Sequence, residues 1–374
     1  MMDGGERLAR MALCALQITA DPQLAHLVEI HRASEVWEAI RRQGDSTALG
    51  RRAQAVDPAV LETATSHVGA TFLIPGDQHW PQGFADLGVC QLGDQGGLPM
   101  GLWVAGNPEL LIHFAGLKAV AVVGSRAATS YGSHVAGELA ADLSSSGWPV
   151  VSGLAFGIDS AAHRGALGIG GPTLAVMATG IDKTYPANHS GLRNQIQASG
   201  VVVTELAPGT RPLRASFLGR NRLIAALSAG TVVVEAGARS GARNTASWAA
   251  ELGRVVMAVP GPVTSSLSLA PHHLIREGLA TLVTSASDVT ALLSPLGVQE
   301  ELPLRGDDQP IDTLSPALRS VREAIPAGAA MGAAELAVAT GMTVPEVIAA
   351  AAELTELGWL GFSDGGWRLP RRDR

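Results

Sequence analysis

Short runs of apolar residues recur along the middle of the chain, and stretches with helical spacing of apolar positions separate most of them. The apolar runs are Ala119–Val123, Pro149–Val151, Thr173–Ala178, Val201–Thr204, Thr231–Val234, Val255–Val259 and Thr281–Val283. The helix-like stretches are Tyr131–Ser146, Asp159–Leu167, His189–Ala198, Arg220–Ala229, Arg243–Leu252 and His272–Glu277. Strands that are apolar throughout and joined by helices are typical of a parallel sheet covered on both faces. The pattern therefore predicts an α/β fold with a doubly wound, Rossmann-like parallel sheet.

Different patterns precede and follow this region. Residues 1–68 have apolar positions at helical spacing, and Asp21 and Asp57 each precede a proline as an N-cap residue does, which predicts a small helical domain. An irregular lead-in rich in Gly and Pro begins at residue 69, so we expect the Rossmann-like domain over 69–296. Residues 297–313 are polar and contain Pro303, Gly306 and Pro310, which is typical of a linker.

Residues 314–374 predict a separate winged-helix-like domain. Helical patterns cover Ser315–Ile325, Gly332–Thr340 and Thr343–Leu357, and Trp359–Leu369 has the pattern of a β-hairpin. A winged helix commonly places its third helix in the major groove of DNA. Between Thr343 and Gly358, however, the chain has three glutamates and no Lys or Arg, which is the wrong charge for approach to phosphates. We expect this domain to contact protein or the rest of its own chain.

Charge and composition limit the classes of function. The net charge of −7 means that any nucleic-acid surface has to be a local basic patch. The two cysteines, Cys14 and Cys90, form no C-x-x-C motif and suggest a reduced thiol state. The first residues lack the apolar core of a signal peptide, and no uncharged apolar run reaches about 18 residues. We expect a cytoplasmic protein with no membrane span.

Small polar and basic residues follow several predicted strands. The first strand ends at Gly124, Ser125 and Arg126, and the second ends at Ser152 and Gly153. A later Gly-rich turn contains Arg239, Ser240 and Gly241 and opens a helix. Because the carboxyl ends of parallel strands meet at one edge of a sheet, we expect these residues to converge there. Backbone N–H groups at helix starts and a permanent guanidinium charge both favour a ligand that carries phosphate.

Further arginines come from the segment before this turn. Between Arg211 and Arg254 the chain has seven arginines and two glutamates, although the whole protein is acidic. The residues that we expect to contribute to the same site are Arg214, Phe217, Arg220, Asn221 and Arg222. Phe217 could belong to the core or could be a platform on which a nucleobase stacks.

Other signatures are absent from the sequence. There is no G-x-x-x-x-G-K-[ST] motif, and Val123–Arg126 has one glycine where a dinucleotide fingerprint needs three. No Ser/His/Asp order or metal-ligand cluster stands out, and His163 is interpreted as a packing or surface residue rather than a catalyst. Positive charge without an evident acid–base pair suits holding a polyanion rather than cutting one. We therefore expect no catalytic residue, no metal and no cofactor.

These stretches resemble the DprA (Smf) family of bacterial DNA-processing proteins. The matching segments are Val122–Arg126, Tyr131-Gly132, Val151–Asp159, Ala162–Ala166, Tyr185-Pro186, Phe217–Ala225, Val233–Ala236, Arg239–Gly241 and Val259–Gly261. The resemblance implies a non-enzymatic protein that binds single-stranded DNA, protects incoming DNA, forms a homodimer and helps to load RecA during natural transformation. It also implies that Arg126 lies in the DNA pocket. Leu218, Phe156 and His273 depart from the residues usual in the family, which are Pro, Arg and Asn.

Two alternatives belong to other classes. A phosphoribohydrolase-like, nucleotide-processing enzyme could use the same Rossmann scaffold, but the Pro-Gly-Gly-x-Gly-Thr motif of that group is missing from Glu235–Arg243. A transcription regulator could act through the winged helix, but the acidic third helix argues against it.

Overall fold

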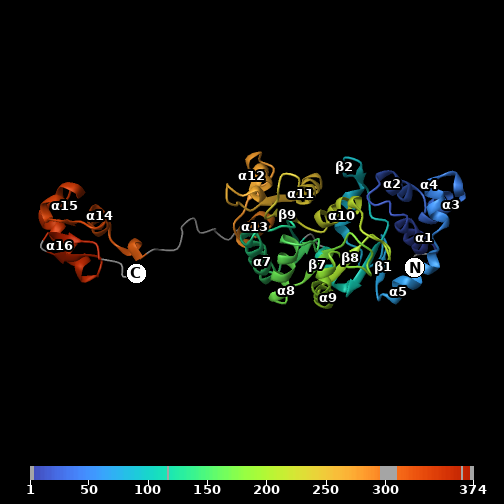
Figure 1. Cartoon of the computed structure of the whole chain (residues 1–374), viewed down its shortest axis with the longest axis horizontal. Coiled ribbons are helices and arrows are strands. Elements are labelled where there is room, and N and C mark those ends of the chain that lie inside the picture. The colour runs from blue at the N-terminus through green and yellow to red at the C-terminus, as the bar shows by residue number, and fades with distance from the viewer. Residues whose placement is uncertain (1–3, 116–117, 295–309, 364, 371–374) are drawn as a thin grey trace. The chain divides into compact units, whose positions relative to one another are not determined.

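A computed structural model describes residues 4–115, 118–294, 310–363 and 365–370 of the chain (Figure 1). The chain forms two compact units, Met1–Glu300 and Glu301–Arg374. Residues 297–309 of the predicted linker lie outside the described residues.

The first unit begins with a group of short helices. These helices are α1 (Gly4–Ala15), α2 (Pro22–Ile30), α3 (Ala33–Arg42), α4 (Ala48–Gln54) and α5 (Pro58–His67). The side chains of Asp21 and Asp57 accept hydrogen bonds from N–H groups in the first turns of α2 and α5, each ahead of a proline. The expected N-caps are confirmed, because an extended aspartate satisfies amides that have no partner in the first turn.

A nine-stranded sheet forms the centre of the first unit. The strands are β1 (Thr71–Leu73), β4 (Leu102–Gly106), β5 (Val120–Val123), β6 (Val150–Ser152), β7 (Thr173–Val176), β8 (Val201–Thr204), β9 (Gly230–Val233), β10 (Val255–Ala258) and β11 (Thr281–Leu282). Their order across the sheet is β1-β4-β8-β7-β6-β5-β9-β10-β11. All neighbours from β8 to β11 are parallel, whereas β4 and β1 add antiparallel pairs at one edge. The predicted Rossmann-like class is confirmed.

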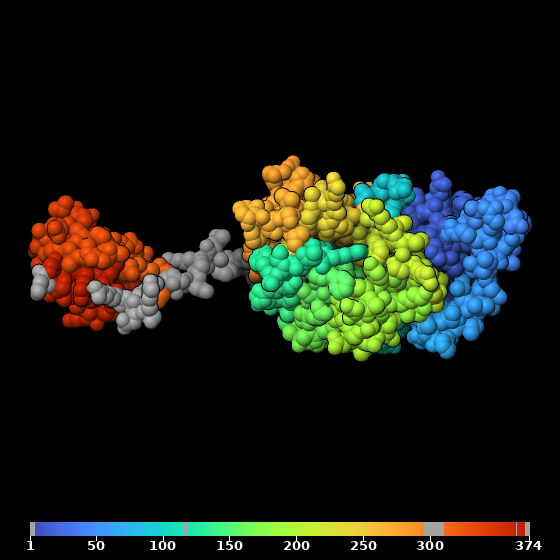
Figure 2. Space-filling view, in the orientation of Figure 1, coloured from blue at the N-terminus to red at the C-terminus, as the bar shows by residue number. Residues whose placement is uncertain are grey.

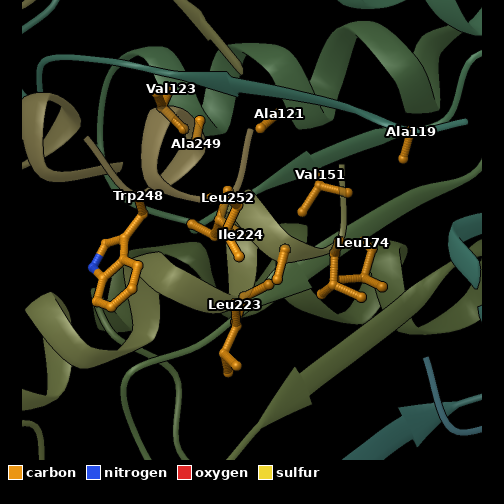
Figure 3. Close-up of a cluster of buried hydrophobic side chains, with 14 of the residues drawn as sticks. Ala119, Ala121, Val123, Val151, Leu174, Leu223, Ile224, Trp248, Ala249 and Leu252 are labelled. Atoms are coloured by element: carbon orange, nitrogen blue, oxygen red, sulfur yellow. The ribbon is translucent and has the colours of Figure 1, made fainter. Parts of the chain in front are cut away.

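Alternate residues of the parallel strands face two different helical layers. Ala121 and Val123 of β5 belong to an apolar cluster that includes Leu223 and Trp248, as Figure 3 shows. Val120 and Val122 of the same strand belong to a cluster on the opposite face. The helices of the layers are α7 (Ser130–Ser145), α8 (Ile158–Gly168), α9 (Ser190–Ser199), α10 (Arg214–Ala226), α11 (Gly241–Glu251), α12 (Leu269–Arg276) and α13 (Ala286–Leu293). Burial on both faces explains why the strands are apolar throughout.

The irregular lead-in of the sequence analysis contains more regular structure than we expected. It supplies β1 and β4, the short β2 (Gln91–Leu92) and β3 (Gln95–Gly96), and the one-turn helix α6 (Ile112–Ala115). Met11 and Cys14 of α1 share an apolar cluster with Trp103 of β4. Helices α1 and α5, which belong to the N-terminal part shown in blue in Figure 2, therefore pack against the sheet and extend its core.

The second unit has three helices and a small antiparallel sheet. The helices are α14 (Pro316–Ala324), α15 (Ala333–Thr340) and α16 (Val344–Glu356), and the strands are β12 (Ala330–Met331), β13 (Gly361–Ser363) and β14 (Gly366–Arg368). The strand order is β12-β14-β13, and the unit has its own apolar core. This is the predicted layout, with β12 as an additional strand. In the described part of the chain no single helix could cross a membrane, and α15 with α16 meet the length and hydropathy criteria only as a pair bent by 104°.

Candidate nucleic-acid interface

The sheet reverses its strand order between β5 and β9. From β5 the chain proceeds through β6 and β7 to β8 on one side, whereas β9, β10 and β11 extend the other side. Loops that follow the two central strands therefore separate from each other and leave a crevice at the carboxyl edge, where open α/β sheets bind ligands. A pocket of about 490 Å³ lies there.

Most of the residues predicted for the site line this pocket. They are Gly124, Ser125, Arg126, Phe217, Arg220, Asn221, Arg239, Ser240 and Gly241. They come from three places in the chain: the loop after β5, helix α10, and the turn between β9 and α11. The expected convergence at one sheet edge is therefore a feature of the structure.

Glu235, two residues after the end of β9, holds the loop that carries Arg126. Its backbone carbonyl accepts a hydrogen bond from the Ser125 amide over 2.6 Å. Its carboxylate accepts one bond from the Thr129 amide over 2.9 Å and one from the Thr129 hydroxyl over 2.6 Å. A Cβ atom at Gly132 would lie 2.2 Å from that carboxylate, so the close approach requires glycine. Glu235 thus fixes the loop after β5 through both its backbone carbonyl and its carboxylate.

The guanidinium of Arg126 lies over an aromatic ring at the mouth of the pocket. Its Cζ atom is 4.8 Å from the centre of the Phe217 ring, and the side chain is exposed to solvent. The Tyr185 ring packs against Phe217 with 5.4 Å between the centroids. A guanidinium at this distance from a ring face is held by cation–π attraction while its N–H groups stay available for a ligand.

Residues one turn apart on helix α10 line the pocket. Phe217 and Asn221 are separated by one turn and both line it, and Arg214 lies one turn before Phe217 at the first residue of the helix. Arg214 is exposed but does not line the pocket itself. The Asn221 side chain donates to the Gly241 carbonyl over 3.3 Å and to Asn244 Oδ1 over 3.1 Å. Asn221 therefore braces the start of α11.

Arg220 and Asp159 form the charged wall of the pocket. Arg220 is 7% exposed, and its Nη1 donates to the Val176 carbonyl. Burial lowers the pKa of Arg220 to about 10, so the side chain stays charged at neutral pH. Burial also raises the pKa of Asp159, against the opposing effect of Arg220 and of backbone N–H groups. Asp159 lies in the first turn of α8 and accepts bonds from the Gly153 and Ala155 amides, so it organises the preceding loop.

Three predicted contacts differ in the structure. Arg222 is 1% exposed, and its Nη2 lies 2.6 Å from Oε1 of the buried Glu205, so it does not reach the pocket. Ser152 is fully buried and donates its hydroxyl to the Val122 carbonyl over 2.7 Å. Ser125 lines the pocket as predicted, but its backbone N–H donates to the Glu235 carbonyl and is not available to a phosphate. These groups stabilise the fold, and we leave them out of the set of ligand contacts.

Gly153 has a packing role beneath the pocket. A Cβ atom there would lie 1.9 Å from Nη1 of Arg220, so only glycine leaves room for the guanidinium. Gly153 also lines a smaller cleft together with Arg126 and Phe217. Its position is therefore next to the predicted site, although it offers a ligand no side chain.

Neither the buried histidine His163 nor any cluster of metal-binding side chains in the described residues indicates a catalytic centre. His163 is fully buried, with Nδ1 2.8 Å from the Thr173 hydroxyl, and burial lowers its pKa to about 3. Of the two roles that the sequence left open, packing residue or surface residue, the structure gives the first, and the ring is neutral. Among the residues that the structure describes, no group of three His, Cys, Asp or Glu side chains is placed to hold a metal ion.

Comparison with known proteins gives the family. Residues 71–294 match the model of the family described as DNA recombination-mediator protein A. A Mycobacterium tuberculosis protein that carries the name DprA is 44% identical over 362 residues, which cover 93% of this chain and 90% of the relative. The chain belongs to the DprA family.

Solved structures of DprA proteins have the same fold. DNA processing protein A from Streptococcus pneumoniae superimposes with a TM-score of 0.64 at 33% identity, covering 79% of this chain and all of that structure. DNA processing protein A from Helicobacter pylori, described for its single-stranded DNA binding mode, gives a TM-score of 0.52 at 26% identity. The match covers 61% of this chain and 97% of that structure. The resemblance noted from the sequence motifs is confirmed.

Proposed function

We propose that this protein is a recombination mediator that binds single-stranded DNA in the pocket between β5 and β9. The observation that carries the proposal is the exposed guanidinium of Arg126 over the ring of Phe217. A guanidinium binds phosphate, and its planar face, or the part of the ring that it leaves uncovered, stacks with an unpaired base. Duplex DNA keeps its base faces inside the helix, so this combination favours a single strand.

The charge around the pocket supports the same proposal. Arg126 and Arg239 are exposed at its rim, and Arg214 is exposed one turn before Phe217. The single carboxyl side chain in the described lining, Asp159, is engaged with backbone amides. An acidic protein thus concentrates positive charge where a polyanion would bind.

The proposed role in the cell follows from family membership. A recombination mediator delivers a single strand to a recombinase, and we propose that the recombinase is RecA and that the protein protects incoming DNA during natural transformation. Both partners would be met in the cytoplasm. On this account the protein holds its strand and catalyses no reaction. Co-precipitation of purified RecA, with and without an oligonucleotide, tests the partnership.

We also propose a homodimer. Leu282 of β11, the last strand of the sheet, is exposed, as are Leu279 just before that strand and Leu269 of α12. Exposed apolar side chains at the edge strand of a sheet are typical of surfaces that another chain covers. Light scattering on the full chain is expected to give twice the monomer mass, and Leu282→Glu is expected to reduce it.

The charges on the second unit favour binding to a protein over binding to duplex DNA. The exposed face of α16 carries Glu346, Glu353 and Glu356 beside the apolar Val344 and Ile348. Phosphates would be repelled by this face. Removing residues 301–374 is therefore expected to leave duplex affinity unchanged in a binding assay.

One observation favours a second candidate, a phosphoribohydrolase-like enzyme. Asp159 lines the pocket and burial raises its pKa, as in some acid–base catalysts. Release of free base from nucleoside monophosphates, lost in Asp159→Asn, would support this candidate. We expect no release, because the carboxylate already holds the 153–155 loop.

The proposed function is tested by comparing single-stranded and duplex oligonucleotides in a fluorescence anisotropy titration. The full chain is expected to prefer the single strand and to lose affinity as salt is added. Equal affinity for both, or none for either, would overturn the proposal.

A further inference from the structure

Two large aromatic side chains that do not line the main pocket are exposed in a cleft that shares Arg126 with it. Phe156 is 44% exposed and Tyr185 is 47% exposed. Both line a cleft that also includes Arg126, Pro186 and Phe217. A single exposed apolar residue is common on protein surfaces, but two exposed rings that border one cleft next to a permanent charge point to a ligand.

Other side chains hold both rings in place from behind. The Phe156 ring packs edge-on against His189 with 4.7 Å between centroids, and His189 Nδ1 lies 3.0 Å from the Leu154 carbonyl. The Tyr185 ring packs against Phe217. Rings that are already fixed lose little conformational entropy when a ligand stacks on them. The exposed parts of these rings are therefore preorganised for stacking with a ligand.

We propose that Phe156 and Tyr185 form a second base-stacking subsite, for a nucleobase next to the one that stacks at Phe217. This inference rests on the proposed function and extends it. Arg126 lines both the main pocket and the cleft, so a phosphate between two successive bases would lie on its guanidinium. The enclosed part of the cleft is about 30 Å³, far too small to take in a nucleobase, so the base stacks against the rings from the solvent side.

The chemistry of the cleft favours a nucleobase over an acidic or a basic peptide. No Asp or Glu is among the described residues that line it, so a cationic side chain would find no carboxylate there and would be repelled by Arg126. A carboxylate would find only Arg126 and would leave the rings uncovered. A nucleotide covers the rings with its base and Arg126 with its phosphate.

Stacking and phosphate contacts respond differently to salt. A variant that lacks one phosphate contact releases fewer counterions when it binds. Its plot of log affinity against log salt concentration is therefore less steep, by about 0.7 for a single strand. Loss of a stacking contact lowers affinity by about 5- to 150-fold without changing that slope. The slope therefore separates the two kinds of contact.

The test measures binding of oligodeoxythymidylate to the full chain across a salt titration. Phe156→Ala and Tyr185→Ala are each expected to lower affinity with the slope unchanged. Phe156→Arg adds a positive charge that can contact a phosphate, so it is expected to make the salt dependence steeper. The control is Phe362→Ala, which removes an exposed phenylalanine in the second unit and is expected to bind as the unmodified protein does. If Phe156→Ala fails to fold, Phe156→Leu keeps apolar volume without the ring.

An oligonucleotide with abasic sugars gives an independent measurement. The unmodified protein is expected to lose more affinity on removal of the bases than the Phe156→Ala/Tyr185→Ala variant does. Equal losses, or variants that bind oligodeoxythymidylate as the unmodified protein does, would overturn the subsite alone. Failure of the unmodified protein to bind a single strand, or full affinity in Arg126→Ala, would instead overturn the proposed function and the subsite with it.

Discussion

The Cζ atom of Arg126 lies 4.8 Å from the centre of the Phe217 ring. The first residue belongs to the loop after β5 and the second to helix α10, so the contact joins two distant parts of the chain across the pocket. A cation above a ring fixes the guanidinium without using its hydrogen-bond donors. The pair thus offers one charged and one aromatic contact at the same point.

The first prediction concerns Gly153. A methyl group there would meet the Arg220 guanidinium, which is buried and bonded to the Val176 carbonyl. We expect Gly153→Ala to lower the free energy of unfolding by about 1–3 kcal/mol, the usual cost of overpacking. Urea denaturation measures the change. Gly241→Ala is the matched control, because its Cβ would meet no atom within 4 Å, and a loss of stability there as large as at Gly153 would contradict the steric explanation.

The second prediction separates the two buried arginines of α10. Arg222→Met removes one partner of the buried pair with Glu205 and is expected to lower the free energy of unfolding by about 3–5 kcal/mol. The double variant Glu205→Leu/Arg222→Met is expected to recover most of this loss, because no charge is left unpaired. Chemical denaturation of the single and double variants checks both values. A folded Arg222→Met protein that loses its DNA affinity would show that the residue contacts DNA after all.

The third prediction follows from His163. Burial lowers its folded-state pKa to about 3, whereas an unfolded histidine titrates near 6.5. The unfolded chain therefore binds the extra proton first as the pH falls, and stability decreases from about pH 6.5 downwards. Between about pH 6 and pH 4 this group alone is expected to remove about 1.4 kcal/mol per pH unit. The difference in unfolding free energy between the unmodified protein and His163→Asn, followed over this range, isolates the effect, and parallel curves would rule it out.

The parallel sheet could be predicted because each central strand is buried on both faces. Val120–Val123 is apolar at every position, since alternate residues contact opposite helical layers. The strands β1 and β4 were missed for the opposite reason. They are short, antiparallel and surrounded by Gly and Pro, and they pair only through distant residues of the chain. Local pattern carries little information about such pairings.

The sequence placed the loop after β5 correctly at the pocket but could not distinguish Arg220 from Arg222. Residues two positions apart on a helix point in different directions, so both could not face one ligand. That geometry is a signal in the sequence, but it does not say which of the two faces the pocket. The answer depends on Glu205, which follows β8 and meets Arg222 only in the folded chain.

The most direct test of the central claim is a salt titration of single-stranded oligonucleotide binding to the unmodified protein and to Arg126→Ala. We expect Arg126→Ala to lower affinity by about 10- to 100-fold, the range for a charge-assisted hydrogen bond, and to reduce the salt slope by about 0.7. Arg52→Ala, which removes an exposed arginine from α4, is the charge-matched control and should bind as the unmodified protein does. Unchanged affinity and slope in Arg126→Ala would contradict the account.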